Sequence, residues 1–175
     1  MNEDRRYFVT DQPGFTPHMG RLVSMMNYAR ATTLHAVKDL TTQQLDFVPA
    51  GFGNSIGALL EHFAAVEVAY QIRTFQHRWA EDDDPELKPW VAGLDLGERI
   101  KELRGRDLDF YIKQLETVRN TTLEKFKTLD DTWLEQEFEF REGVNANHYW
   151  CWFHVFEDEI NHRGQIRLIR QNLPK

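Results

Sequence analysis

Four long stretches of this chain repeat apolar residues at intervals of three and four, the spacing that places them on one face of an α-helix. The first extends from Pro17 to Leu40. Its repeating positions are Met19, Leu22, Val23, Met26, Ala29, Thr33, Val37 and Leu40. Further helices are predicted from residue 54 or 55 to about 79, from 107 to 129 and from about 147 to 171. Helices of this length bury their apolar faces most simply against one another, so we expect an all-α four-helix bundle.

The segments between these helices differ in character. Residues 49–53 contain proline and two glycines and break the chain after the first helix. An acidic run at residues 81–84, followed by further prolines and glycines, predicts a long connection between the second and third helices, with a short helix near residues 98–103. Residues 137–141 alternate as a short strand or extended segment does, just before the last helix. Without a linker or repeat, residues 1–175 are expected to form a single domain.

Charge and hydropathy exclude several classes of partner. The formal net charge of −7 and the lack of a Lys/Arg cluster argue against nucleic acid. No apolar run approaches the length needed to span a membrane, and the N-terminus lacks the apolar core of a secretory signal. Cys151 is the only cysteine, so the chain forms no internal disulfide. We therefore expect a soluble cytoplasmic protein, with Cys151 as a small buried hydrophobe.

The last predicted helix has two unusual faces. His154, Asp158 and His162 recur every fourth residue, which places three metal-capable side chains in one stripe. Most of the opposite face is aromatic and carries Tyr149, Trp152, Phe153, Phe156 and Ile160. Taken alone, this helix favours a simple interpretation, in which the aromatic side is the core and the polar stripe is a solvated ladder of charges.

His62 on the second predicted helix changes this interpretation. Its helical neighbours are small or apolar, so the imidazole is expected to point inward with space beside it: Ser55, Ala58, Leu59, Ala65, Val66 and Ala69. A hydrogen-bonded core histidine remains the alternative to a metal ligand. If the polar stripe of the last helix also faces inward, its aromatic face needs another cover. A second subunit supplies one, so we expect a homodimer.

Helix geometry limits which side chains share one metal ion. Residues four apart lie about 6 Å apart along the axis, whereas residues eight apart lie about 12 Å apart. The chelating pair is therefore His154 with Asp158, or Asp158 with His162. With His62 added, either pair supplies two imidazoles and one carboxylate. That set of ligands suits Zn²⁺, Ni²⁺, Fe²⁺ or Mn²⁺.

Two segments resemble a known family. Residues 161–166, Asn-His-Arg-Gly-Gln-Ile, resemble the terminal helix of the DinB-like (YfiT-related) superfamily, and Ser55–His62 resembles its second helix. The resemblance implies a dimeric four-helix bundle whose metal is held by three histidines, one from the second helix and two, four residues apart, from the last. His62 and His162 match that pattern, and Asp158 stands where the third histidine would be. His154 then becomes an alternative ligand, or a group that supports the ligands or faces the substrate.

The same resemblance implies a function. Characterised relatives include transferases that use bacillithiol, mycothiol or glutathione, and others are described as metal-dependent hydrolases. We expect a metal-dependent enzyme that transfers a low-molecular-weight thiol to an electrophilic small molecule, with the divalent ion held by His62, Asp158 and His162. The alternatives are a hydrolase that uses the same site, or a non-catalytic dimeric bundle that binds a metal or ligand.

Overall fold

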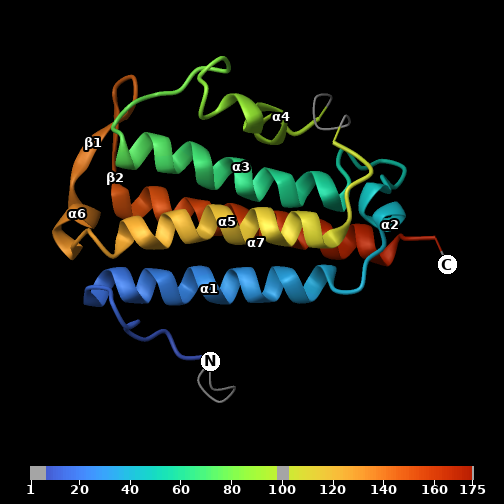
Figure 1. Ribbon diagram of the computed structural model, residues 1–175, viewed down its shortest axis with the longest axis horizontal. Coiled ribbons are helices and arrows are strands. Elements are labelled where there is room, and N and C mark those ends of the chain that lie inside the picture. The colour runs from blue at the N-terminus through green and yellow to red at the C-terminus, as the bar shows by residue number, and fades with distance from the viewer. Residues whose placement is uncertain (1–6, 98–102, 175) are drawn as a thin grey trace.

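Four long helices dominate the computed structural model, which describes residues 7–97 and 103–174. They are α1 (Pro17–Val37), α3 (Ile56–Phe75), α5 (Leu108–Phe126) and α7 (His148–Gln171). α1 and α3 lie on opposite sides of α5 and α7 (Figure 1). The mostly helical character and these four helices are as the sequence predicts, although α3 ends at Phe75 instead of near residue 79.

Shorter elements fill the connections. They are α2 (Thr42–Asp46), the 3₁₀ helix η2 (Lys88–Trp90), α4 (Val91–Leu94), α6 (Asp131–Glu135), β1 (Glu137–Arg141) and β2 (Val144–Asn147). The long connection between α3 and α5 is confirmed, and its η2 and α4 turns pack along α3. The short helix expected near residues 98–103 falls almost wholly outside the described residues.

The extended segment expected before the last helix is β1, and it pairs with a second strand that the sequence did not indicate. β1 and β2 form an antiparallel hairpin in which Glu137 lies opposite Asn147. Asn147 then ends the hairpin and begins α7 at once, because its side chain accepts a hydrogen bond from the Trp150 backbone N–H at 2.9 Å. The hairpin therefore fixes where α7 starts.

The start of α3 is fixed in the same way. The Ser55 side chain accepts a hydrogen bond from the Ala58 backbone N–H at 3.1 Å. A side-chain cap of this kind stabilises a helix by about 1 kcal/mol. His62, two turns into the helix, lies on the side of α3 that faces α7.

The aromatic side of α7 is covered mainly from within the chain. Trp152 and Phe156 are buried in a core cluster with α1, α5 and α6. Residues of α1 that complete this cluster are Met19, Leu22, Val23, Met26 and Ala29. Phe153 and Ile160 stay 44% and 40% exposed. α1 thus takes most of the covering role that the sequence interpretation assigned to a second subunit.

Four charged side chains, one from each long helix, meet in the interior. We call Arg30, Glu67, Arg119 and Glu159 the charge tetrad; all four are buried. Arg119 Nε donates to Glu67 Oε1 at 2.7 Å, and Arg30 Nε donates to Glu159 Oε1 at 3.1 Å. Arg30 Nη2 also reaches Glu67 Oε2 at 3.4 Å. Each buried charge therefore has an opposite partner, as burial requires.

Burial by itself raises the pKa of Glu67, but the adjacent Arg119 and Arg30 and a hydrogen bond from Thr122 outweigh it. The pKa of Glu67 therefore lies below its ordinary value. Among the described residues, no helix has both the length and the apolar character needed to cross a bilayer.

Candidate metal centre

His62 is held in one orientation by the connection that packs on α3. Its Nδ1 lies 2.8 Å from the carbonyl oxygen of Gly93 in α4. Because a carbonyl oxygen only accepts hydrogen bonds, Nδ1 carries a proton, and in the neutral imidazole, the form that binds a metal, Nε2 keeps its lone pair. Nε2 faces α7. A hydrogen bond from the far nitrogen to a backbone carbonyl is how metal-binding histidines are commonly oriented.

Gly93 is needed for this contact because α4 lies very close to α3. A Cβ at this position would lie 2.9 Å from the Ala65 Cβ and 3.1 Å from the Glu61 Cγ. Both distances are shorter than ordinary van der Waals contact. A larger residue would therefore move α4 away from α3 and take the carbonyl oxygen away from His62.

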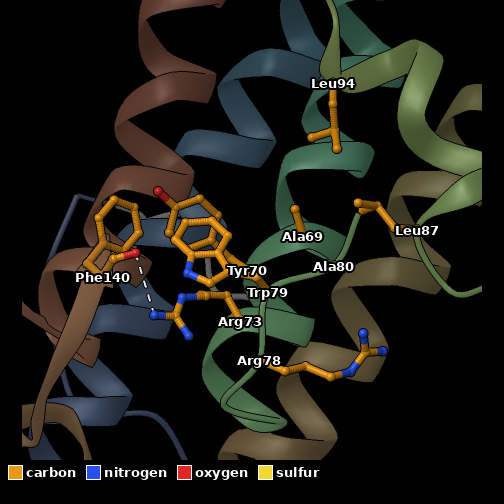
Figure 2. Close-up of a pocket in the computed structure, with 9 residues that line it drawn as sticks. All are labelled: Ala69, Tyr70, Arg73, Arg78, Trp79, Ala80, Leu87, Leu94 and Phe140. Atoms are coloured by element: carbon orange, nitrogen blue, oxygen red, sulfur yellow. Dashed lines mark hydrogen bonds between the residues drawn. The ribbon is translucent and has the colours of Figure 1, made fainter. Parts of the chain in front are cut away.

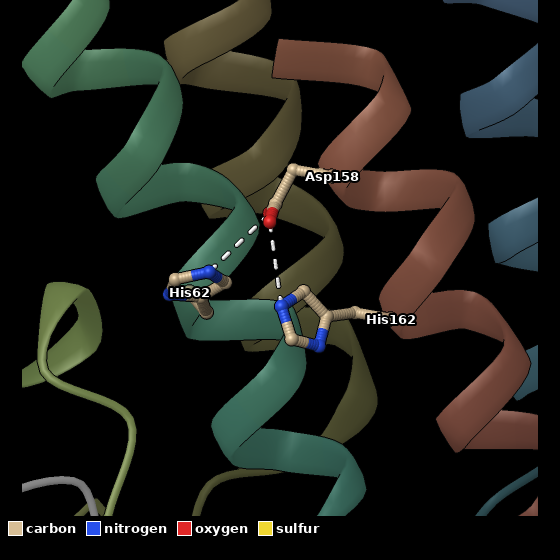
Figure 3. Close-up of side chains that lie close together, drawn as sticks. All are labelled: His62, Asp158 and His162. Atoms are coloured by element: carbon tan, nitrogen blue, oxygen red, sulfur yellow. Dashed lines mark ion pairs between the residues drawn. The ribbon is translucent and has the colours of Figure 1, made fainter. Parts of the chain in front are cut away.

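Asp158 and His162 reach the same point from α7. They lie one turn apart, and both point toward His62 in the space between α3 and α7 (Figure 3). Asp158 Oδ2 is 3.3 Å from His62 Nε2, and Asp158 Oδ1 is 3.3 Å from His162 Nε2. One ligand atom from each of the three residues lies within 4.8 Å of the other two. We call His62, Asp158 and His162 the triad.

The charges within the triad support one another. Burial raises the pKa of Asp158, but the contacts with His162 and His62 outweigh it and hold the pKa well below its ordinary value. The contact with Asp158 raises the pKa of His162, against the opposite effect of burial. Asp158 is therefore ionised at neutral pH, the form in which a carboxylate binds metal ions.

The triad fits a divalent ion. At metal–ligand distances of 2.0 to 2.2 Å, two ligands of a tetrahedral ion lie about 3.4 Å apart. Asp158 lies 3.3 Å from each imidazole, through Oδ2 toward His62 and Oδ1 toward His162, and one ligand atom from each residue lies within 4.8 Å of the other two. Asp158 Oδ2 is also buried, and apart from its contact with His62 Nε2 it has no hydrogen-bond partner among the described residues. A cation between the three side chains would satisfy that oxygen, whereas an unsatisfied buried anion is costly.

His154 lies apart from this cluster. Its Nδ1 is 3.0 Å from Glu157 Oε2, and its ring stacks on Trp150 with the centroids 5.3 Å apart. Of the two chelating pairs that the sequence allowed, the structure brings Asp158 and His162 to His62. A supporting or substrate-facing role for His154 stays a prediction.

Sequence reasoning missed a pocket beside the triad. It has a volume of about 200 Å³ and lies between α3, the connection that follows it and β1 (Figure 2). Ala69, Tyr70 and Arg73 of α3 form one wall, and Trp79 and Leu94 are among the residues that complete it. The sequence offers one signal for this pocket, because the small residue Ala69 lies two turns after His62 on the same side of α3.

A family model for mycothiol S-transferases matches residues 21–174. The chain belongs to the mycothiol S-transferase family. The match includes α3 and α7, the two helices that carry the triad. The family is part of the DinB/YfiT-like superfamily, so the predicted resemblance is confirmed. No curated protein matches the chain.

Proposed function

We propose that this protein is a metal-dependent thiol S-transferase that joins a low-molecular-weight thiol to an electrophilic small molecule. The observation that carries the proposal is the triad itself, with three ligand atoms within 4.8 Å of one another in a member of the mycothiol S-transferase family. Mycothiol is the first thiol to test, because the family is described by it. The ion is Zn²⁺, Ni²⁺, Fe²⁺ or Mn²⁺, held by His62, Asp158 and His162.

The reaction requires a thiolate, because the neutral thiol is a poor nucleophile. When bound, the divalent ion supplies a positive charge that favours the ionised form of the thiol sulfur. The chain's own residues prepare the site, since Gly93 holds His62 in the correct tautomer and Asp158 stays ionised. The sulfur forms a bond to the electrophilic carbon, the leaving group departs with its electron pair, and the thiol proton passes to solvent.

The sulfur comes from a bound cosubstrate and not from the protein. Cys151 is the only cysteine in the sequence, and it is buried in the aromatic core. Burial raises the pKa of Cys151 to about 12. Such a thiol is neutral at physiological pH and therefore unreactive. We further place the protein in the cytoplasm, where low-molecular-weight thiols stay reduced.

We also propose that residues 1–175 form one domain, a four-helix bundle of the DinB/YfiT-like type. Support comes from the pairwise packing, since α1 and α3 each contact both α5 and α7. A homodimer is part of the proposal. Phe153 and Ile160 are exposed on α7 and offer an apolar surface to a second copy.

The proposal is tested first by metal content. Wild type is compared with His62→Ala and Asp158→Ala by elemental mass spectrometry, after incubation with Zn²⁺, Ni²⁺, Mn²⁺ or anaerobic Fe²⁺. His35→Ala is the matched control, because His35 is an exposed histidine of α1. We expect about one ion per chain in wild type and His35→Ala, and about tenfold less in the two triad variants.

The second arm measures turnover. Mycothiol consumption with an alkyl halide is followed above the uncatalysed rate, with and without chelator. We expect thiol consumption that stops on metal removal and in Asp158→Ala. A wild-type protein without bound metal under any of these conditions would contradict the proposal. Metal-dependent ester hydrolysis without thiol consumption would instead identify the hydrolase, and bound metal without either reaction would identify a binding protein.

A further inference from the structure

The pocket and His62 of the triad lie along the same two elements, α3 and α4. His62 and Ala69 lie seven residues apart on α3, which places them on one side of the helix about 10 Å apart. On the opposite wall, the Gly93 carbonyl oxygen accepts the His62 hydrogen bond, and the next residue, Leu94, lines the pocket. The pocket therefore lies about two turns of α3 from His62, with α4 running beside both.

The far end of the pocket is aromatic and also leads toward the triad. Tyr70 and Phe140 stack with their centroids 6.3 Å apart, and Trp79 lies beside Phe140 at 5.8 Å (Figure 2). The Tyr70 ring also contacts His154, with the centroids 5.7 Å apart, and His154 lies one turn before Asp158 on α7. Flat π-systems pack well against ring faces arranged in this way.

The two cations of the pocket are largely engaged, although Arg73 Nε is buried without a hydrogen-bond partner among the described residues. The Arg73 guanidinium donates to the Glu139 carbonyl oxygen and lies over the Trp79 ring, 4.5 Å from its centroid. Arg78 pairs with Asp84 and with Glu86, the latter at 2.9 Å. Except at that single Nε, an anionic ligand would have to displace these contacts. The remaining lining offers ring faces and aliphatic side chains, which favour an uncharged ligand.

The volume limits the size of the group that the pocket can bury. A cavity of about 150 Å³ lined by apolar side chains holds benzene. At about 200 Å³, this pocket accommodates one substituted aromatic ring. Leu87 and Leu94 lie across the pocket from the aromatic residues, so both faces of such a ring meet apolar groups (Figure 2).

We propose that this pocket binds an uncharged, aryl-bearing electrophile and directs its reactive carbon toward the triad. The proposal rests on the proposed function and names the class of acceptor that the thiol meets. In the case of a benzylic halide, the thiolate sulfur forms a bond to the benzylic carbon, and the carbon–halogen bond breaks. The halide leaves with the electron pair, and the proton of the thiol has passed to solvent.

Binding tests the pocket without any turnover. Benzyl alcohol, an unreactive analogue of a benzyl halide, is titrated into the protein and followed by saturation-transfer NMR. Ala69→Leu fills the pocket and should weaken binding at least about tenfold. Ala31→Leu is the matched control, because it makes the same change at an exposed helical alanine of α1. Acetamide, a small polar probe, should bind none of these proteins measurably.

A second variant removes a pocket wall without entering the core. Trp79 is 57% exposed, so Trp79→Ala should fold normally and still weaken benzyl alcohol binding. Thermal unfolding of both pocket variants verifies folding. If wild type does not bind benzyl alcohol, or if folded Ala69→Leu and Trp79→Ala bind it as wild type does, the pocket assignment is overturned.

Kinetics then connect the pocket to the reaction. Benzyl bromide and bromoacetamide carry the same leaving group but differ in the aromatic ring. The ratio of their kcat/KM values, corrected for background, should fall about tenfold in Ala69→Leu and stay unchanged in Ala31→Leu. An unchanged ratio in Ala69→Leu overturns the proposal. Pocket-dependent binding of benzyl alcohol without thiol transfer by wild type would overturn the proposed function and leave an aromatic binding site.

Discussion

Asp158 gives the triad a negative charge that a third histidine would not supply. The carboxylate lies 3.3 Å from an imidazole nitrogen of each partner, and its pKa is held below the ordinary value. Carboxylates favour harder ions than imidazoles do. The residue at position 158 should therefore set which ion the site prefers and how much positive charge is left to stabilise a thiolate.

Replacing this carboxylate tests its role directly. Asp158→His restores the three-histidine set implied by the superfamily resemblance, so we expect Mn²⁺ affinity to fall at least about tenfold relative to Ni²⁺ affinity. Competitive equilibrium dialysis followed by elemental mass spectrometry measures the ratio. Asp109→His is the control, because Asp109 is an exposed residue of α5. An unchanged preference in Asp158→His would show that Asp158 does not contact the ion.

The burial of Cys151 leads to a second prediction about a single residue. Its thiol is buried, and burial raises its pKa to about 12. Labelling by Ellman's reagent at neutral pH should therefore be at least about a hundredfold slower in the native protein than in guanidinium chloride. Labelling of the native protein at the unfolded rate would mean that Cys151 is accessible and ionised, and it would reopen the cysteine as a nucleophile.

At the scale of elements, α7 is buried along two faces at once. One face carries the triad toward α3, and the other packs Trp152 and Phe156 against α1. Glu159 lies next to Asp158 in sequence but belongs to the charge tetrad that joins all four long helices. The tetrad therefore helps to hold α7 in the rotation that presents Asp158 and His162 to His62.

Neutralising one member of the tetrad should loosen this arrangement. Glu67→Gln removes the anion that pairs with Arg119 and Arg30, so we expect a loss of about 3 to 5 kcal/mol in unfolding free energy. Urea denaturation measures it. The matched control is Glu116→Gln on the exposed side of α5, where the change should stay within about 0.5 kcal/mol. Equal effects of the two variants would contradict a stabilising tetrad.

The lowered pKa of Glu67 leads us to expect that its contribution to stability depends on pH. The pKa of Glu67 in the folded protein lies below the ordinary value of 4.5, so the unfolded chain takes up a proton there first as pH falls. The contribution of ionised Glu67 to the free energy of unfolding is fully present above pH 4.5, and it is lost as pH drops through the pKa of the folded protein. Urea titrations of wild type and Glu67→Gln should therefore converge as pH falls below 4.5. A stability difference that stays constant would contradict this.

At the scale of the whole molecule, the interior is completed largely by the chain itself. α1 covers the aromatic side of α7, and α4 packs on α3 beside His62. What remains on α7 is a smaller apolar surface that includes Phe153 and Ile160. A dimer formed through this surface would join subunits that each already contain a complete triad.

Sedimentation velocity tests the dimer. We expect wild type to sediment as a pair of 20.7 kDa chains and Ile160→Glu to shift toward monomer, because a charge would be buried at the interface. Val144→Glu is the control, since Val144 is 41% exposed in the hairpin against 40% for Ile160. A wild type that stays monomeric at all concentrations would contradict the homodimer.

Local patterns were sufficient to predict the helices and the candidate ligands. Apolar spacing located α1, α3, α5 and α7, and the caps Ser55 and Asn147 lie where capping residues were expected or one residue from the predicted start. Side chains four apart on one helix must share a face, whatever surrounds the helix. That is why Asp158 and His162 were identified together, and why His62 was expected to point inward.

Contacts between distant segments were decided only by the tertiary structure. Periodicity describes one helix at a time, and it is silent on which turn of α7 meets His62, so His154 and His162 were equal candidates. No local signal indicated that Gly93 would place its carbonyl oxygen 2.8 Å from His62, or that Trp79 and Phe140 would enclose a pocket with α3. These features depend on how the helices cross and where the connections pack, since many long-range contacts set them together.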